Sequence, residues 1–433
     1  MAEIHPFKAV MYSTEKIGDI TQVLTPPYDV ITPAMQEGFY QSHPNNFVRI
    51  DFGTEHPGDN DVENRYTRAA SFLNQWLEEG VLIEDGSPAI YVYDQTYSIE
   101  GREFTRRAFV SLVPVRPYES KSVLPHELTH AGPKLDRLNL TKATDSAFSQ
   151  IFVLYDDEEC QINQMLESRR EDQALLEFEE PHGGTSRIFR VTDIDAIRSV
   201  QDYLHDKPLY IADGHHRYET SLNFSQFSLK NNPGLHGAKY VAMSCVSMND
   251  PGLVILPTHR SVKLPEGQSL DEFMNKLQSR FSCRASGDVE EVLQSIGNQG
   301  GKTFIGMYVP KTGFSVLEID FEKDGANDKD HSKDWNELDV SVLHCRILKD
   351  CMLVPEEDLF SKGPIFYSHS HSECITKVES GEYDVCFFIM NATLADLKTI
   401  VRSEEKMPPK STFFYPKLMS GLFTYRMKSF EMT

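Results

Sequence analysis

The nine residues Tyr210–Tyr218, Tyr-Ile-Ala-Asp-Gly-His-His-Arg-Tyr, constrain this chain more than any other stretch. An apolar strand end runs into Asp213 and Gly214, and the residues after His215 follow helical spacing. We expect Asp213 to cap the helix and Gly214 to allow the tight turn before it. The first turn would then present backbone N–H groups and a positive dipole end beside two His and an Arg. The stretch therefore predicts an anion-binding corner, typically for phosphate. A polar, salt-bridged helix start without a ligand is the alternative.

The charge of the chain limits its partners. Its 433 residues carry 65 acidic against 43 basic side chains, a formal net charge of −22. Such a field repels nucleic acid and anionic membranes, so a phosphate group must be held by a local basic pocket. We find no signal-like N-terminus and no apolar run that could span a bilayer, and the seven cysteines are scattered without a Cys-x-x-Cys pair. We therefore expect a cytoplasmic protein that binds neither nucleic acid nor membrane, and its oligomeric state stays open.

Helix and strand patterns alternate along the chain. Apolar side chains on one face predict a helix over 60–79, with Asn60 and Glu63 at capping-box spacing. Two alternating stretches on either side of Glu100-Gly101 predict a hairpin, and the apolar run Tyr240–Ser247 predicts a buried strand.

This mixture predicts the α/β class, with α+β as the alternative, and mixed sheets in several domains. We divide the chain into an N-terminal α/β region (1–118), a phosphate-binding core (119–265) and a C-terminal α/β region (266–433).

The segment that contains His126, Glu127 and His130 matches the motif His-Glu-x-x-His, in which two His hold zinc and the Glu is a general base. That geometry needs a helix, yet Pro125 precedes the motif and Gly132-Pro133 follows it, which leaves about one helical turn. A zinc metallopeptidase is therefore one alternative. The interpretation that we prefer places Glu127 in a loop as a carboxylate base, with His126 beside it, and a solvated polar turn is the third.

Further basic residues lie near these motifs in an otherwise acidic chain. Arg137 follows the Glu127 segment, and Arg260 follows an apolar strand candidate. The stretch Met407–Gly421 carries Lys410 and a second Lys within a frame of proline and aromatic residues. This stretch could close over a phosphate, and a well-packed C-terminal loop is an equal alternative.

At Asp213–Arg217 the chain resembles the ParB/sulfiredoxin-like superfamily, whose phosphate-binding box is a helix start of the type Gly-x-(His/Arg)-Arg. Within that superfamily, Asp-Gly-His-His-Arg is most similar to the free-serine kinases, which also carry a catalytic Glu upstream. The whole chain also resembles a widespread microbial family catalogued as a domain of unknown function. The motifs that carry this second resemblance are Pro26–Val30, Pro125–Glu127, Asp136–Leu138, Ala212–Tyr218, Pro257–Arg260 and Pro408–Lys417.

The kinase resemblance implies a ParB/sulfiredoxin-like core and a phosphotransferase that converts free L-serine into O-phosphoserine, with ADP or pyrophosphate as donor. The catalytic residues would be Glu127 as general base, Asp213 as the Mg²⁺ ligand, and His216. The donor phosphates would be held by Gly214, His215, His216 and Arg217, with Arg137, Arg260 and Lys410 as further candidates. The serine would be bound by His126, Thr129 and Tyr218.

A nucleotide-binding switch or interaction module without kinase activity is the main alternative, since members of the ParB branch bind nucleotide in this way. It would bind CTP or ADP and form no product from serine. The net charge of −22 argues against a DNA partner for such a module.

Overall fold

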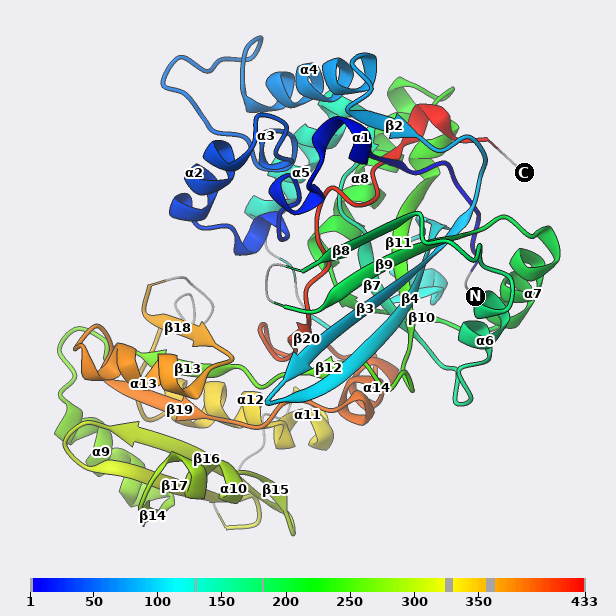
Figure 1. Ribbon diagram of the computed structural model, residues 1–433. Coiled ribbons are helices and arrows are strands. Elements are labelled where there is room, and N and C mark those ends of the chain that lie inside the picture. Colours follow the sequence, from blue (N-terminus) through cyan, green and yellow to red (C-terminus); the bar gives the residue numbers. More distant parts are fainter. Residues whose placement is uncertain are drawn as a thin grey trace. The chain divides into compact units, whose positions relative to one another are not determined.

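Two parts of the chain are each built around a sheet of their own (Figure 1). The structure is a computed structural model that describes residues 3–127, 129, 131–180, 183–323, 330–355 and 363–431. Unit 1 comprises Met1–Pro125, Thr129–Leu253 and Pro416–Thr433, and unit 2 comprises His126–Leu128 and Val254–Tyr415. Both sheets are accompanied by helices, so the predicted α/β class is confirmed, and the predicted mixed sheet is found in unit 1.

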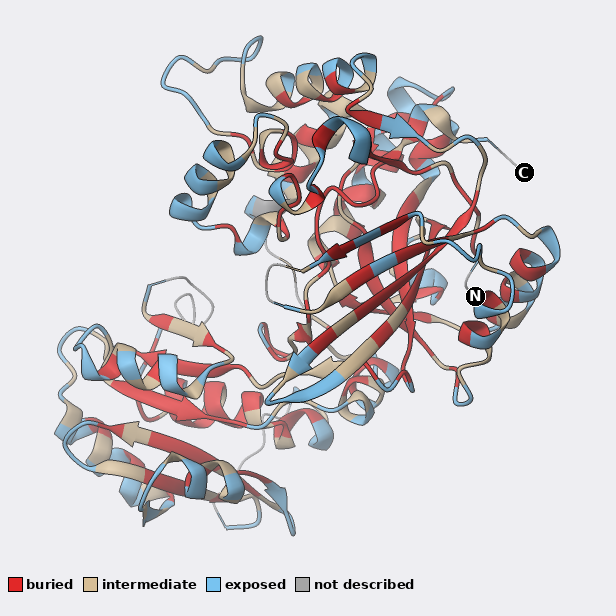
Figure 2. Cartoon of the chain, in the orientation of Figure 1, coloured by how far each residue is buried: buried red, intermediate tan, exposed pale blue. Residues whose placement is uncertain are grey.

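Unit 1 contains an eight-stranded mixed sheet. Its strands are β3 (Ile90–Ile99), β4 (Arg102–Pro114), β5 (Val123–Leu124), β7 (Ile151–Tyr155), β8 (Leu176–Glu179), β9 (Thr185–Val191), β10 (Leu209–Asp213) and β11 (Tyr240–Ser247). They are ordered β5-β10-β7-β11-β4-β3-β9-β8. The central strand β7 is buried along its whole length, and Figure 2 shows buried residues running through the middle of the sheet. The predicted hairpin at Glu100-Gly101 is confirmed as β3 and β4, and the predicted strand Tyr240–Ser247 is β11.

The helices of unit 1 surround this sheet. They are α1 (Thr14–Ile17), α2 (Pro33–Ser42), α3 (Val48–Asp51), α4 (Arg65–Glu78), α5 (Ala131–Thr144), α6 (Gln161–Glu167), α7 (Ile194–Leu204) and α8 (His215–Asn231). Short 3-10 helices are η1 (Ile20–Gln22), η2 (Tyr28–Val30), η3 (Tyr118–Ser120), η4 (His236–Lys239) and η6 (Met427–Ser429). The short strands β1 (Val10–Tyr12) and β2 (Leu82–Glu84) pair, as do β6 (Ser146–Ala147) and β21 (Tyr425–Arg426). Helices α6 and α7 contribute apolar side chains to the core that the sheet covers. In the part of the chain that the structure describes, no helix has the length and apolarity that a membrane span requires.

The helix predicted over 60–79 begins later than expected, at Arg65. Its capping box is formed by Asn64 and Thr67, because the Asn64 side chain accepts from the Thr67 N–H and the Thr67 hydroxyl accepts from the Asn64 N–H. The Asn60 side chain instead accepts from the N–H groups of Val62 and Glu63, in the loop before the helix. Asn64 is also able to cap a helix and lies closer to the apolar residues of α4, so the helix begins after Asn64 and not after Asn60.

Unit 2 contains a seven-stranded antiparallel sheet. Its strands are β13 (His259–Val262), β14 (Ser282–Ser286), β15 (Gly297–Gln299), β16 (Lys302–Val309), β17 (Gly313–Asp320), β18 (Ile365–Ser368) and β19 (Val385–Phe388). Six are ordered β14-β17-β16-β19-β13-β18, and β15 pairs with β16. A separate two-stranded ladder joins β12 (Val254–Ile255) to β20 (Phe414–Tyr415).

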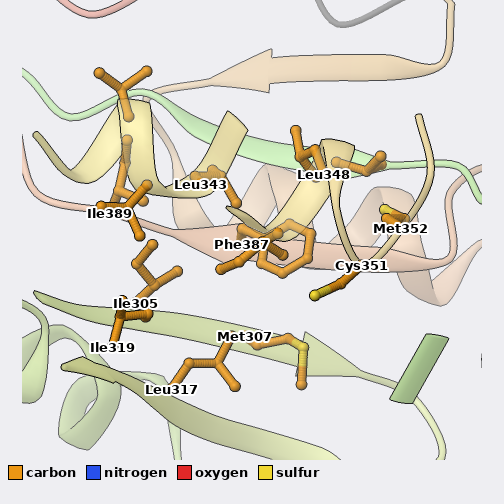
Figure 3. Packing of buried hydrophobic residues seen from close by; sticks show 14 of the residues in the cluster. Ile305, Met307, Leu317, Ile319, Leu343, Leu348, Cys351, Met352, Phe387 and Ile389 are labelled. Atoms are coloured by element: carbon orange, nitrogen blue, oxygen red, sulfur yellow. The ribbon is translucent and has the colours of Figure 1, made fainter. Parts of the chain in front are cut away.

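The helices of unit 2 are α9 (Leu270–Arg280), α10 (Val289–Ser295), α11 (Lys333–Glu337), α12 (Asp339–Ser341), the π-helix η5 (Val342–Lys349), α13 (His371–Glu379) and α14 (Leu394–Arg402). Apolar side chains of η5 pack with those of the sheet strands in one buried cluster (Figure 3). Fully buried members include Ile305, Leu317, Leu343, Leu348 and Phe387. Unit 2 therefore has a hydrophobic core of its own.

The structure divides the chain differently from the three regions that we predicted. Regions 1–118 and 119–265 share one sheet, because β3 pairs with β9 and β4 pairs with β11. The predicted boundary at 265 lies inside unit 2, after β13 has paired with β18 and β19. The segment Pro416–Thr433 returns to unit 1, where β21 pairs with β6. Long-range strand pairing of this kind leaves no signal in local composition, so the sequence pattern could not reveal it.

Candidate functional site

The predicted strand, turn and helix at Tyr210–Tyr218 are confirmed. Strand β10 ends at Asp213, and α8 begins at His215. Gly214 lies between them with a φ of +94°, in the left-handed region that glycine adopts without strain. The pairing of β10 with β7 shifts register between Ile211 and Asp213, and such a bulge changes the direction of the side chains that follow it.

Asp213 does not cap α8, contrary to our prediction, since the N-cap residue is Gly214 and no side chain caps the helix. The Asp213 carboxylate instead accepts from two cations: Oδ2 from Arg217 Nη2 at 2.6 Å, and Oδ1 from Lys417 Nζ at 2.7 Å. Burial alone would raise the pKa of Asp213, but Lys417 and Arg217 outweigh it and hold that pKa well below its usual range. The carboxylate is therefore ionised at neutral pH, with one negative charge against two positive ones.

Arg217 lies across the turn. Its Nη1 donates to the Gln150 carbonyl at 2.6 Å, and its Nη2 donates to Asp213. A Cβ atom at Gly214 would lie 2.9 Å from Arg217 Nε, closer than Cβ contacts normally come. Gly214 is thus required both for the backbone conformation and for the close approach of the guanidinium.

The start of α8 completes an electropositive corner. The first N–H groups of an α-helix have no partner within the helix, and they carry the positive end of its dipole. His215 is buried and His216 is half-buried in this first turn, and His215 is among the groups that lower the pKa of Asp213. The described residues therefore bring together Gly214, His215, His216 and Arg217, as predicted, and add Lys417.

Lys417 was not among the predicted site residues, although the basic stretch Met407–Gly421 that contains it was noted. The side chain chosen from that stretch was Lys410, which lies in unit 2. The stretch that supplies Lys417 was therefore visible in the sequence, and the predicted role of Lys410 in binding the donor stays a prediction.

Arg137, predicted to bind donor phosphate, is buried on α5 and already engaged by carboxylates. Its Nη1 donates to Asp51 Oδ1 at 2.8 Å, and its Nε donates to Asp136 Oδ2 at 2.7 Å. The guanidinium also lies over the Tyr28 ring, 4.0 Å from the ring centroid. Two carboxylates thus surround one cation, which is the reverse of the charge arrangement at Asp213.

Two predicted substrate-binding residues of unit 1 have structural partners. Tyr218 is fully buried, and its hydroxyl donates to the Arg116 carbonyl at 2.7 Å. Thr129 donates to Glu219 Oε2 at 2.8 Å, and Lys134 donates to the same oxygen at 2.8 Å. Their predicted role in binding serine stays a prediction, and the geometry of Tyr218 is that of a core residue.

The remaining predicted residues lie in unit 2, where they gather around Lys410. Glu127 Oε1 accepts from the Lys410 N–H at 3.0 Å, and Arg260 Nη2 donates to the Lys410 carbonyl at 2.9 Å. Arg260 is fully buried, and this burial lowers its pKa to about 10. His126 is also buried, with Nε2 at 2.8 Å from the Thr412 hydroxyl. Arg260 thus anchors the backbone of the Lys410 turn.

The structure bears differently on the two predicted metal sites. His126 and Glu127 precede α5 and do not lie on a helix, and His130 is outside the described residues. Both oxygens of Asp213 accept from cations, so a Mg²⁺ ion on this carboxylate would lie next to two positive charges. Within the described ranges, no group of three or more His, Cys, Asp or Glu could hold a metal ion. A Mg²⁺ site on Asp213 stays a prediction that this geometry does not favour.

Comparison with known proteins identifies a family. Residues 4–341 match the family model described as a protein of unknown function, DUF1015. This match confirms the predicted resemblance to a family catalogued as a domain of unknown function over residues 4–341. Among curated proteins, none matches the chain.

Solved structures give distant likenesses. A conserved hypothetical protein from Pyrococcus furiosus has a TM-score of 0.34 at 12% identity, over 72% of this chain and 94% of that one. A free serine kinase in complex with AMP has a TM-score of 0.35 at 12% identity, over 70% and 86%. SbnI with a C-terminal truncation, from Staphylococcus aureus, has a TM-score of 0.32 at 14% identity, over 72% and 85%. Scores this low do not by themselves establish a shared fold or activity.

Asp213→Asn should lower the free energy of unfolding at neutral pH by about 3 kcal/mol, because Lys417 and Arg217 lose the carboxylate between them. The native pKa of Asp213 lies below its unfolded value of about 3.9, so the carboxylate contributes fully above that pH. Its contribution is lost as the pH falls from there through the native pKa. Urea unfolding should therefore show a wild-type advantage that begins to shrink below about pH 4. Asp206→Asn, at a side chain that is 83% exposed, is the control and should change stability little. An equal effect of both substitutions would contradict the assignment.

Proposed function

The chain belongs to the DUF1015 family, and we propose that it is a phosphotransferase that phosphorylates the hydroxyl of free L-serine. The observation that carries this proposal is the convergence of Arg217 and Lys417 on Asp213 beside the start of α8. The resemblance of Asp213–Arg217 to the free-serine kinases supports it. The donor would be ADP or pyrophosphate.

The corner gathers groups that a phosphate ligand would contact. Arg217 and Lys417 both lie against Asp213, next to the positive end of the α8 dipole, where an anion is favoured. Asp213 also holds both side chains in place, which reduces the reorganisation needed when the donor binds. Arg217, Lys417, His215 and His216 would together neutralise the negative charge that spreads over the transferred phosphoryl group.

The reaction moves one phosphoryl group and one proton. The bond between the terminal phosphorus of the donor and its bridging oxygen breaks, and a new bond forms from that phosphorus to the serine hydroxyl oxygen. ADP would leave as AMP, and pyrophosphate would leave as phosphate. The hydroxyl proton goes to a general base, a role that we assign to Glu127 from the sequence resemblance. Within unit 2 the Glu127 carboxylate is held by the Lys410 N–H.

We expect phosphoserine to appear when purified protein is incubated with Mg²⁺, L-serine and either ADP or pyrophosphate. ³¹P NMR measures the product directly, and ATP, ADP and pyrophosphate are supplied separately to name the donor. Binding of ADP without any product from serine would favour the nucleotide switch instead. No product with any donor would contradict the kinase proposal.

Lys417→Ala should weaken ADP or pyrophosphate binding by roughly tenfold, equivalent to about 1.4 kcal/mol, because it removes one of the two cations at the turn. Isothermal titration of the donor without serine measures this effect. Lys428→Ala is the matched control, since Lys428 lies in the same C-terminal segment and its side chain is 63% exposed. If both variants bind the donor as the wild type does, Lys417 has no part in the site.

Glu127→Gln should abolish turnover and leave donor affinity nearly unchanged. Glutamine keeps a carbonyl oxygen that can accept from the Lys410 N–H, but it cannot take up the serine proton. The NMR assay and the donor titration together separate the two effects. Turnover equal to that of the wild type would remove Glu127 as the base.

A further inference from the structure

A cavity lies within unit 2, and the functions proposed above do not use it. Its volume is about 360 Å³. Its lining comes from the end of α10 and the start of β15, from the start of α12, from the segment that joins β19 to α14, and from Ser411. One water needs roughly 10–15 Å³ of such space, and sites for small molecules commonly measure about 300–1,000 Å³. The cavity is therefore large enough for a small organic molecule.

Part of the lining is the apolar core of unit 2. Leu338, Val340 and Ile389 line the cavity and also belong to the buried cluster of Figure 3, where Ile389 is labelled. Met390 adds an apolar side chain that is 44% exposed. Because closely packed core residues hold their positions, these side chains form a ready surface for an aliphatic group.

Asp339 contributes a carboxylate to the lining. The residue is half-buried at the start of α12, and its Oδ2 accepts from the Met390 N–H at 3.1 Å. Its Oδ1 takes part in no hydrogen bond or ion pair with the described residues, and it is not one of their buried unpartnered atoms. This oxygen is therefore accessible to solvent and free to accept from a ligand.

Asp396 contributes a second carboxylate. Its Oδ2 accepts from the Thr393 N–H at 2.8 Å and from the Thr393 hydroxyl at 2.7 Å, as part of the capping box of α14. Its Oδ1 has no partner among the described residues and, by the same criterion, is accessible. Each carboxylate thus offers the cavity one oxygen that the fold does not use.

The cavity has an uncompensated negative charge. None of the described residues that line it is Lys, Arg or His. Arg260 acts on Asp339 from a fully buried position, and its Nη groups donate to the carbonyls of Thr258 and Lys410. Two carboxylates therefore face one buried cation whose hydrogen bonds are directed to the backbone.

The ionised form of Asp339 is unfavourable for the fold. Burial and the negative charge of Asp396 raise the pKa of Asp339 to about 6, against the Met390 N–H and Arg260. This value lies above the unfolded value of about 3.9, so the ionised carboxylate lowers stability increasingly as the pH rises from about 4 through 6. A carboxylate retained under these conditions beside a cavity indicates a role in binding.

We propose that this cavity binds an aliphatic organic cation, with its ammonium head group against Asp339 and Asp396 and its chain on the apolar wall. An ammonium group carries three donors and no acceptor, which suits two carboxylate oxygens that lack donors. Its positive charge would relieve the repulsion between the two carboxylates. The aliphatic chain would cover Leu338, Val340 and Ile389.

The test compares n-hexylamine with 1-hexanol, which has the same chain and no charge. Saturation-transfer NMR on the full chain, titrated at about 0.15 M salt to screen distant charges, measures both affinities. We expect the amine to bind at least about tenfold more tightly than the alcohol. Equal affinities would identify an apolar pocket without a cation site, and this result, or no binding of the amine, would overturn the proposal.

Asp339→Asn should weaken n-hexylamine binding at least about fivefold and leave 1-hexanol binding unchanged, because it removes one charge and keeps an acceptor for the Met390 N–H. The variant should be at least as resistant to urea as the wild type at pH 7.5, since it loses an unfavourable charge. Asp334→Asn, at an exposed position of α11, is the matched control for net charge.

If Asp339→Asn does not fold, Asp396→Asn keeps an acceptor for Thr393 and should still weaken amine binding severalfold. Unchanged amine affinity in the folded variants, or an equal loss in Asp334→Asn, would overturn the proposal. These titrations contain neither serine nor a phosphoryl donor, so their outcome does not depend on the kinase proposal.

Discussion

The contacts of Asp213 with Arg217 and Lys417 are the interaction on which the candidate site depends. Lys417 is 204 positions away from Asp213 in the sequence, so the corner is complete only after the C-terminal segment has joined unit 1. Fully buried Arg106 holds that segment from another side, because its Nη2 donates to the Pro416 carbonyl at 2.7 Å. Arg106 lies on β4 and Asp213 ends β10, two strands of one sheet. The sheet therefore determines the position of both partners.

The balance of charge around each basic residue indicates which of them can serve a ligand. Arg137 faces two carboxylates, and Arg260 is buried with its donors directed to backbone carbonyls. Both arginines hold distant segments of the chain together. Removing the partner of a buried charge is strongly destabilising. Asp213 has the opposite arrangement, with two cations around one carboxylate. Cations beside a helix start are what an anion requires, so counting basic residues in the sequence overstates the number of candidate phosphate ligands.

Local features of the site could be predicted from the sequence because they depend on neighbouring residues. Apolar spacing and Gly214 indicated the strand end, the turn and the helix start, and the structure confirms all three. The partners of charged side chains could not be predicted, since they come from remote positions. Asp213 has the spacing of a helix cap, yet its carboxylate is engaged by Lys417. Asp51 lies in an ordinary buried stretch and gives no sign in the sequence that it pairs with Arg137.

Arg217 connects two groups of charged side chains in unit 1. On one side it donates to Asp213, which also accepts from Lys417. On the other side it lines a small cavity together with Asp51 and Arg137, which form an ion pair with each other. Burial raises the pKa of Asp51, and the positive charges of Arg137 and Arg217 oppose that rise. Because one guanidinium acts on both carboxylates, a change at Arg217 would disturb the candidate phosphate corner and the buried Asp51–Arg137 pair together.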